Sequence, residues 1–213
     1  MATSEVSDEN LALWARDGQR DAFDRLVVRH KASLYRFIRH YVGDADDAYD
    51  ILQETFISIW LSLSRFDPGR NFSAWMRTIA LNKCRDFGRR QSVRQKFLRA
   101  ATLFQSWEND VVYREQIKKE DATEERLLRL DAAIVALPSF YKEPLLLTMV
   151  LGLSHKEAAE QLGTTTKAVE MRVRRARLML RKAVGDSNAE PSNQLRDQSS
   201  KEATVQIKRP IEE

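Results

Sequence analysis

The chain is 213 residues long, 43% hydrophobic and 31% charged, with a formal net charge of +4 at pH 7. Only 7 glycines and 5 prolines interrupt it, which argues against an all-β fold built on frequent turns and favours long helices. The single cysteine, Cys84, excludes an intrachain disulfide and a cysteine-rich metal site. The polar, acidic residues 1–10 are unlike a signal peptide, and no apolar run approaches the ~18 residues of a membrane span. We therefore expect a cytoplasmic protein without membrane insertion.

The first 92 residues are predicted to form a helical bundle, because their apolar residues recur at three- and four-residue steps. Gly43 ends one helix and a Phe66–Gly69 turn follows another, both strong stop signals. Trp75 falls on the apolar face of the last helix, so we assign it to the core rather than to base stacking. The predicted helices span residues 11–18, 21–43, 44–63 and 72–90.

A second helical domain is predicted at residues 122–184, after a flexible linker at 93–121 with partial helical character. Ser154 can cap a helix there, and Glu157 three residues later completes a capping box. Residues 185–213 are polar and almost free of large apolar side chains, so we expect a disordered tail. The fold class is therefore all-α, with two small helical domains joined by a flexible linker. The predicted helices of the second domain span residues 122–136, 139–151, 154–163 and 165–183.

The segment from Ser154 to Ala176 matches a helix-turn-helix, a motif whose second helix enters the major groove of DNA. A tight turn at Gly163 separates its two helices, and the small residues Ala158 and Ala159 permit a close crossing. An ordinary charged hairpin is the alternative, but the small residues, the turn glycine and a basic second helix coincide, which favours DNA binding. The outward-facing candidates for contact with DNA are Thr164, Thr165, Thr166, Lys167, Glu170, Arg172, Arg174 and Arg175.

Basic residues concentrate in two separate helical segments. Residues 77–99 carry eight Lys and Arg against Asp86 alone, and residues 167–182 carry seven against Glu170 alone. Two basic helices far apart in the sequence indicate two points of contact with one polyanion. The helix at 44–63 has an acidic outward face, which by itself is typical of solvated surface.

Three segments resemble the sigma-70 family of RNA polymerase sigma factors: DADDAYDILQETFISIW, FDPGRNFSAWMRTIALNKCRDFGRR, and LPSFYKEPLLLTMVLGLSHKEAAEQLGTTTKAVEMRVRRARLMLRK. They occur in the family's order, and the resemblance covers about residues 10–183. The 213 residues leave no room for the extra domains of a housekeeping sigma factor, so the chain looks like the compact extracytoplasmic-function (ECF) group. The resemblance implies that the first segment binds core polymerase, the second recognises and melts the minus-ten promoter element, and the third reads the minus-thirty-five element.

Carried over by position, the resemblance implies two further sets of site residues. An acidic helix suits the basic coiled coil of the polymerase β′ clamp, because charge complementarity raises the association rate and fixes the register. Arg70 and Asn71 would capture an unstacked base, and the helix behind them would hold the promoter strand in a basic groove. The resemblance also implies contact with the β flap and a cognate anti-sigma factor. The polymerase-binding candidates are Asp47, Asp50, Gln53, Glu54 and Ile57. The minus-ten candidates are Arg70, Asn71, Arg77, Asn82, Lys83, Asp86, Arg89 and Arg90.

Two other classes of function compete with this interpretation. A stand-alone helix-turn-helix regulator would share the DNA-binding half, but it would not need the acidic helix or the FDPGRNF loop. An enzyme is disfavoured because His30, His40 and His155 are scattered and no metal-ligand spacing, phosphate loop or nucleophile elbow occurs. We therefore expect no catalytic residues, no cofactor and no bound metal.

Overall fold

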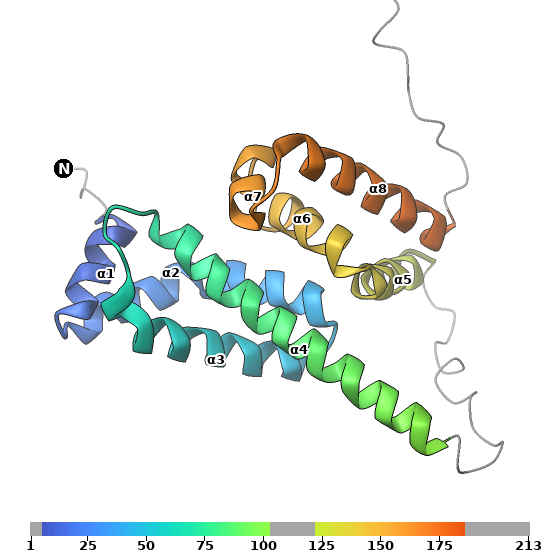
Figure 1. The fold of residues 1–213 in the computed structure, drawn as a ribbon, viewed down its shortest axis with the longest axis horizontal. Helices are drawn as coiled ribbons and strands as arrows, with labels where there is room; N and C mark the ends of the chain where they lie inside the picture. The colour runs from blue at the N-terminus through green and yellow to red at the C-terminus, as the bar shows by residue number, and fades with distance from the viewer. Residues whose placement is uncertain (1–5, 103–121, 186–213) are drawn as a thin grey trace, which may run out of the picture.

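The computed structural model describes residues 6–102 and 122–185, and these residues are helical apart from turns and caps (Figure 1). The all-α prediction is confirmed, since no strand occurs in the described part of the chain. The elements are α1 (Asp8–Arg16), α2 (Arg20–Val42), α3 (Ala45–Ser62), the 3-10 turn η1 (Leu63–Arg65), α4 (Phe72–Thr102), α5 (Ala122–Ala136), α6 (Ser139–Met149), α7 (His155–Leu162) and α8 (Thr166–Val184).

Local signals in the sequence set the ends of the N-terminal helices. The side chain of Asp44 accepts hydrogen bonds from the first turn of α3, and Ser7 caps α1 in the same way. Gly43 ends α2 in the left-handed conformation, at φ +94°, which glycine adopts without steric cost. Helices α1 to α4 then bury one apolar face each in a shared core. The largest buried side chains of this bundle are Leu11, Leu26, Leu34, Phe37, Ile38, Ile59, Phe72 and Leu81.

Helix α4 is longer than its sequence pattern indicated. We expected it to end near Arg90, but it continues to Thr102. Residues 91–102 contain neither glycine nor proline, and eight of the twelve are Gln, Arg, Lys, Leu or Ala, which favour helix, so nothing in them stops a helix. The first ten residues of the expected linker are therefore part of α4. The rest of the linker and the expected disordered tail lie outside the described residues.

The C-terminal domain has the predicted helix-turn-helix. Ser154 and Glu157 form the expected capping box at the start of α7. Gly163 ends α7 with φ +62°, and Thr165 caps α8 through a hydrogen bond from the Ala168 amide. Apolar residues of α7 and α8 are buried where the two helices cross, which fixes the angle of the second helix. The buried residues at this crossing are Ala158, Ala159, Val169, Val173 and Ala176.

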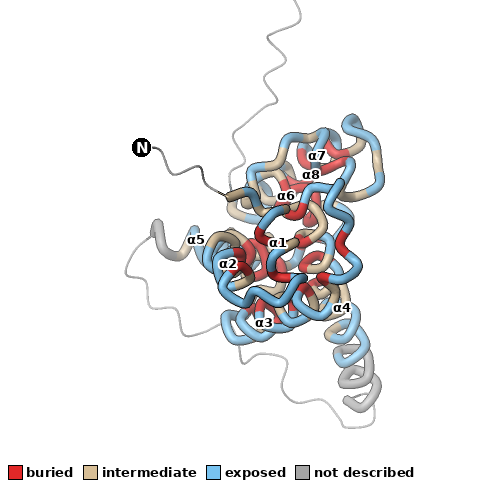
Figure 2. The backbone as a smooth tube through the Cα atoms, turned by 90° about the vertical axis from the view of Figure 1, so that its left-hand side faces the viewer, coloured by how far each residue is buried: buried red, intermediate tan, exposed pale blue. Residues whose placement is uncertain are grey.

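The two domains pack directly against each other. Helices α5 and α6 lie against α2, and buried residues of both domains belong to one continuous apolar cluster (Figures 1 and 2). The backbone at the end of α2 comes close to α5 at Gly43, where an added Cβ would lie 2.8 Å from Cγ2 of Val135. The contact between the domains therefore affects which of the residues predicted to contact polymerase and DNA are exposed.

Candidate nucleic-acid interface

Helix α3 presents the five predicted polymerase-binding residues on its outer side. Asp50, Gln53, Glu54 and Ile57 are exposed, and Asp47 is half-buried. Slight burial and the neighbouring carboxylates of Asp44 and Asp50 raise the pKa of Asp47, as expected where like charges are crowded. The structure brings this set together as one acidic, partly apolar face.

Sequence reasoning missed an apolar residue beside this face. Leu61 is 75% exposed and lies one helical turn beyond Ile57, which is 58% exposed. Their four-residue spacing was the available signal, since residues four apart lie on the same side of a helix. An exposed apolar pair next to carboxylates is typical of a protein interface, in which apolar anchors are bordered by charge.

The acidic face of α3 is joined to the basic face of α4. The Nζ atom of Lys83 lies 3.3 Å from Oε2 of Glu54, so a predicted polymerase residue is paired with a predicted DNA residue. Further along α4, Arg89 forms an ion pair with Asp86. These four side chains and Arg90 line an open cavity of about 370 Å³. Two of the predicted site-residue sets are therefore neighbours in space.

The loop before α4 is held by its own side chains. Oδ1 of Asp67 accepts a hydrogen bond from the Gly69 amide at 2.9 Å, and its Oδ2 lies 3.5 Å from Nε of Arg70. Oδ1 of Asn71 accepts from the Ala74 amide at 2.8 Å, so Asn71 caps α4. The side-chain oxygen of Asn71, which is predicted to capture a base, is therefore already engaged in a hydrogen bond that caps the helix. Arg70 is exposed and can reach a ligand.

An aromatic cluster of Phe66, Phe72 and Trp75 packs at the two ends of this loop. The ring of Trp75 lies 5.2 Å from that of Phe66 and 5.7 Å from that of Phe72. Trp75 is half-buried, in agreement with its assignment to the core. The loop thus has a rigid apolar base, which is what a site for an unstacked nucleotide requires.

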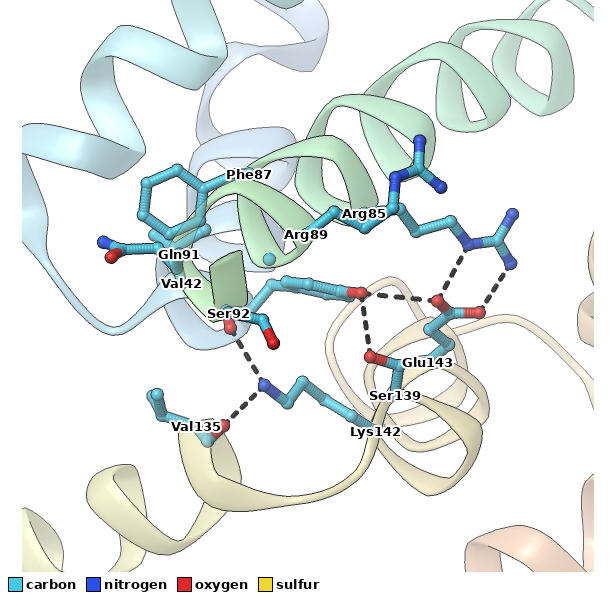
Figure 3. A pocket seen from close by; sticks show the side chains of 12 residues that line it. Val42, Arg85, Phe87, Arg89, Gln91, Ser92, Val135, Ser139, Lys142 and Glu143 are labelled. Atoms are coloured by element: carbon cyan, nitrogen blue, oxygen red, sulfur yellow. Dashed lines mark hydrogen bonds and ion pairs between the residues drawn. The ribbon is translucent and has the colours of Figure 1, made fainter. Parts of the chain in front are cut away.

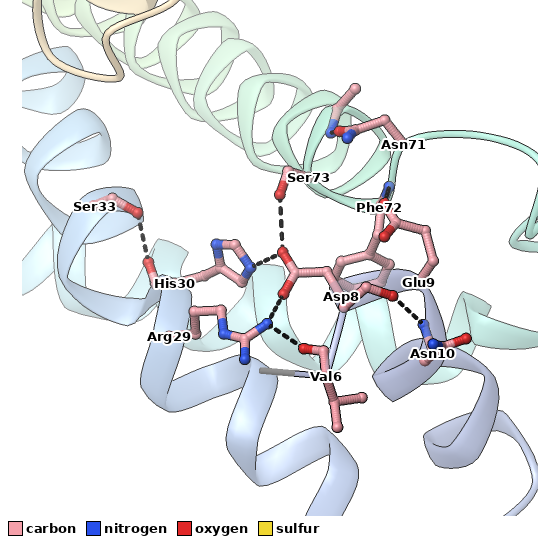
Figure 4. A network of polar contacts seen from close by, with 12 residues as sticks. Val6, Asp8, Glu9, Asn10, Arg29, His30, Ser33, Asn71, Phe72 and Ser73 are labelled. Atoms are coloured by element: carbon pink, nitrogen blue, oxygen red, sulfur yellow. Dashed lines mark hydrogen bonds and ion pairs between the residues drawn. The ribbon is translucent and has the colours of Figure 1, made fainter. Parts of the chain in front are cut away.

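Two carboxylates of α1, which sequence reasoning missed, also fix the start of α4 (Figure 4). Oε1 of Glu9 accepts from the Phe72 amide at 3.1 Å, and Oδ2 of Asp8 accepts from the Ser73 hydroxyl at 3.1 Å. Asp8 also pairs with Arg29 and, at 2.7 Å, with Nε2 of His30. Burial by itself raises the pKa of Asp8, but these partners hold it below its ordinary value. More than 60 residues separate Asp8 from Ser73, so no local pattern could reveal the contact.

Helix α8 presents most of the predicted minus-thirty-five residues to solvent. Thr165, Thr166, Lys167, Glu170, Arg174 and Arg175 are exposed, whereas Thr164 and Arg172 are half-buried. The guanidinium of Arg172 lies 3.9 Å from the ring centre of Phe140, a cation–π contact that restricts its orientation. Phe140 is 56% exposed and was not among the predicted residues.

One predicted minus-ten residue lies under the other domain. Arg77 is half-buried, and the next residue, Thr78, accepts a hydrogen bond from Nε2 of Gln161 in α7 at 2.6 Å. In contrast, Asn82, Arg89 and Arg90 are exposed. The structure therefore leaves only part of the predicted promoter surface of α4 open to solvent.

Cys84, the single cysteine of the sequence, lies in the core of the N-terminal bundle. Cys84 is buried, which raises the pKa of its thiol to about 12 and leaves it protonated at neutral pH. Residues 6–102 and 122–185 hold no group of three His, Cys, Asp or Glu side chains arranged for a metal ion. Within the same residues, no helix is both long enough and apolar enough to cross a bilayer.

Two protein-family models match the chain. Residues 26–94 match the family model of sigma-70 region 2, and residues 127–180 match that of sigma-70 region 4. The chain is 39% identical over 175 residues to the RNA polymerase sigma factor NccH of Alcaligenes xylosoxydans xylosoxydans, covering 81% of this chain and 92% of the relative. It is 28% identical over 198 residues to the ECF RNA polymerase sigma factor SigE of Mycolicibacterium smegmatis, covering 87% and 72%.

A solved structure shows the same architecture. The fold matches CnrH, solved in complex with the cytosolic domain of CnrY, with a TM-score of 0.61 and 33% sequence identity. The match covers 85% of this chain and 99% of CnrH. The two family models, the relatives and this fold lead to one conclusion: the chain belongs to the sigma-70 family of RNA polymerase sigma factors, in its ECF group.

Proposed function

We propose that this sigma factor binds core RNA polymerase through the acidic face of α3 and reads its promoters through α4 and α8. The observation that carries the proposal is the contact between Glu54 and Lys83, which places the predicted polymerase face beside the predicted minus-ten face. Polymerase docked on α3 would then hold DNA close to α4. The N-terminal domain would thus contact both polymerase and promoter DNA, as promoter-specific initiation requires.

The proposed polymerase face on α3 combines charged and apolar side chains. Asp50 and Glu54 supply the charge that steers a basic partner, and Ile57 and Leu61 supply apolar area that leaves water on binding. The β′ clamp is the proposed partner of this face, and the β flap is the proposed partner of the C-terminal domain. A stand-alone regulator would have no use for an exposed acidic and apolar face of this kind.

The minus-ten element is proposed to bind across α4 and the loop before it. Arg70 would approach a flipped base from the loop, while Asn71 keeps the helix start in place. Single-stranded DNA binds where a basic groove follows its backbone, and α4 would supply the side chains of such a groove. The groove residues are Arg77, Asn82, Lys83, Asp86, Arg89 and Arg90.

The minus-thirty-five element is proposed to bind α8 in its major groove. Thr165 and Thr166 lie at the start of the helix, where hydroxyls suit phosphate oxygens. Arg172, which contacts Phe140, and Arg174 are proposed to bind guanine edges, and a bidentate contact of this type discriminates by about 1–3 kcal/mol. Arg175 is assigned to phosphate.

The regulation of this factor is inferred from its relatives. CnrH was solved together with the cytosolic domain of CnrY, so a partner protein binds that sigma factor. We infer that a cognate anti-sigma factor restrains the present chain in the cytoplasm. The chain itself supplies recognition, and the polymerase supplies the chemistry, so we assign it no catalytic residue and no cofactor.

Run-off transcription with purified core polymerase on genomic promoter fragments tests the proposal. Specific transcripts should appear only when the wild-type chain is added, and the Asp50→Arg plus Glu54→Arg variant should not produce them. The matched control is Asp17→Arg plus Asp24→Arg, which makes the same charge change at two exposed positions, one just after α1 and one in α2. If the chain shifts duplex DNA alone and leaves transcription unchanged, a stand-alone regulator replaces the sigma factor.

A further inference from the structure

Acceptors of the chain itself occupy backbone amides at the start of α4. The Phe72 amide donates to Oε1 of Glu9 at 3.1 Å, and the Ala74 amide donates to Oδ1 of Asn71 at 2.8 Å. The Trp75 amide donates to the backbone oxygen of Asn71 at 3.2 Å. Free amides at the start of a helix commonly bind phosphate. Because these amides already have acceptors, we expect the loop before α4 to offer DNA its side chains rather than its backbone.

Glu9 and its neighbour Asp8 hold the start of α4 from a helix that is distant in the sequence (Figure 4). Glu9 is half-buried and binds the first backbone amide of α4, and Asp8 accepts a hydrogen bond from the Ser73 hydroxyl at 3.1 Å. The side chain of Asp8 is 15% exposed and is itself fixed by contacts with Arg29 and His30 of α2. The position of the loop is therefore determined by α1, which is anchored on α2.

The contacts at the start of α4 also fix the orientation of the Asn71 side chain. Its Oδ1 atom faces the Ala74 amide as the helix cap, so its Nδ2 atom is turned away from that amide. Asn71 is exposed, and within the described ranges its Nδ2 has no hydrogen-bond partner. An amide nitrogen donates hydrogen bonds and does not accept them. A ligand that reaches the free end of Asn71 therefore meets a donor.

Donors and nearby carboxylates together select an uncharged ligand with an acceptor atom. Arg70, the neighbour of Asn71, is exposed, and its guanidinium also only donates. Asp8, Glu9 and Asn71 line one cavity of about 370 Å³, and Asp67 lies 3.5 Å from Arg70. The negative charge of these carboxylates disfavours a phosphate but not a neutral base. The keto oxygens and ring nitrogens of an unstacked base are acceptors of the required kind.

We propose that Asp8 and Glu9 are positioning residues for minus-ten recognition: they hold the start of α4 so that Nδ2 of Asn71 donates to an acceptor atom of the captured base. This proposal rests on the proposed assignment of the loop before α4 to base capture. Neither carboxylate touches DNA, and both act through Asn71. A change in α1 thus alters the recognition of the base without altering the contacts of α4 with the DNA backbone.

Binding of the holoenzyme to fork-junction DNA tests this assignment. The DNA comes from a promoter found by run-off transcription, with the non-template minus-ten strand left single-stranded and one position at a time made abasic. The position at which removal of the base weakens binding most is the captured base. The ratio of the dissociation constants of the abasic and intact probes measures base capture, because changes that affect both probes equally cancel in it.

Asn71→Asp tests the donor. Aspartate keeps an oxygen that caps α4 but has no Nδ2 donor, and its added charge acts on both probes. We expect the ratio to fall about fivefold, the size of one net hydrogen bond, with the helical circular dichroism unchanged. An unchanged ratio would show that Asn71 does not read the base and would overturn the proposal.

Variants of α1 and of its contacts test the positioning. Glu9→Ala should lower the ratio by a similar factor, and Glu9→Gln should restore it, because the glutamine oxygen can still accept from the Phe72 amide. Ser73→Ala, which removes the hydroxyl bound by Asp8, should lower the ratio in the same way. In an Asn71→Asp background, Glu9→Ala should leave the ratio unchanged, because its effect passes through Asn71.

A matched control separates positioning from general stability. Asp17→Ala removes a carboxylate at an exposed position just after α1 and should not change the ratio. If Glu9→Ala weakens binding of both probes equally, Glu9 has only a structural role and the proposal is wrong. Failure of the proposed function would look different, because no abasic position would then weaken binding by the wild-type holoenzyme.

Discussion

Asp8 offers a sharp test of how the loop before α4 is positioned. Its carboxylate is 15% exposed and accepts hydrogen bonds from Arg29, His30 and the Ser73 hydroxyl. Asp8→Asn keeps the size of the side chain but removes the charge. Hydrogen bonds to charged groups each contribute about 1.5–3 kcal/mol, and the amide can keep some of them. We therefore expect the substitution to lower the free energy of unfolding at pH 7 by about 2–3 kcal/mol.

The pH dependence of this effect has a definite sign. The pKa of Asp8 in the folded chain lies below its ordinary value of 3.8. The stabilisation is therefore complete above about pH 5 and is lost as the pH falls through the folded-state pKa. Wild type and Asp8→Asn should converge in stability at the acid end of this range.

Urea unfolding followed by tryptophan fluorescence is the appropriate assay. Three of the four tryptophans, Trp14, Trp60 and Trp75, lie in the N-terminal bundle, so the signal reports mainly on that domain. Asp17→Asn is the matched control, since Asp17 is exposed and makes only a 3.6 Å contact with Arg16. A stability loss at pH 7 below about 0.5 kcal/mol, the range of ordinary surface substitutions, would refute this account of Asp8.

Three more predictions concern the other surfaces. Leu61→Ser should weaken binding to core polymerase in a titration without changing thermal stability, because Leu61 is 75% exposed; Val28→Ser, 79% exposed on α2, is the control. Phe140→Ala should weaken binding to minus-thirty-five duplex about two- to five-fold, because it removes one exposed cation–π contact of ~0.5–1 kcal/mol. If Phe140→Ala causes an equal loss in an Arg172→Ala background, Phe140 does not act through Arg172. Ala158→Leu should destabilise the C-terminal domain by about 1–3 kcal/mol in thermal circular dichroism, since Ala158 is 0% exposed at the helix crossing, whereas Lys156→Leu should not.

The local features of the sequence determined most of the helices. The Ser154–Glu157 capping box, the Gly43 and Gly163 stops and the apolar steps of the helix-turn-helix act within a few residues, so their pattern is visible in the chain. The extension of α4 beyond Arg90 was missed because its residues lack a strong apolar face, although they also lack a stop signal. Motif order alone was enough to indicate the sigma-70 family. The named contact residues on α3, α4 and α8 stay predictions.

Only the tertiary structure decided how these elements meet. The pairing of Glu54 with Lys83, the support of the loop by Asp8 and Glu9, and the pairing of Arg85 with Glu143 (Figure 3) join residues 29 to 65 positions apart. Such contacts depend on how whole helices pack, and each residue involved looks like an ordinary surface charge in the sequence. The covering of α4 by α7 is a contact of the same kind. Periodicity therefore determines which face of a helix is buried, and packing between helices determines which charged residues lie beside one another.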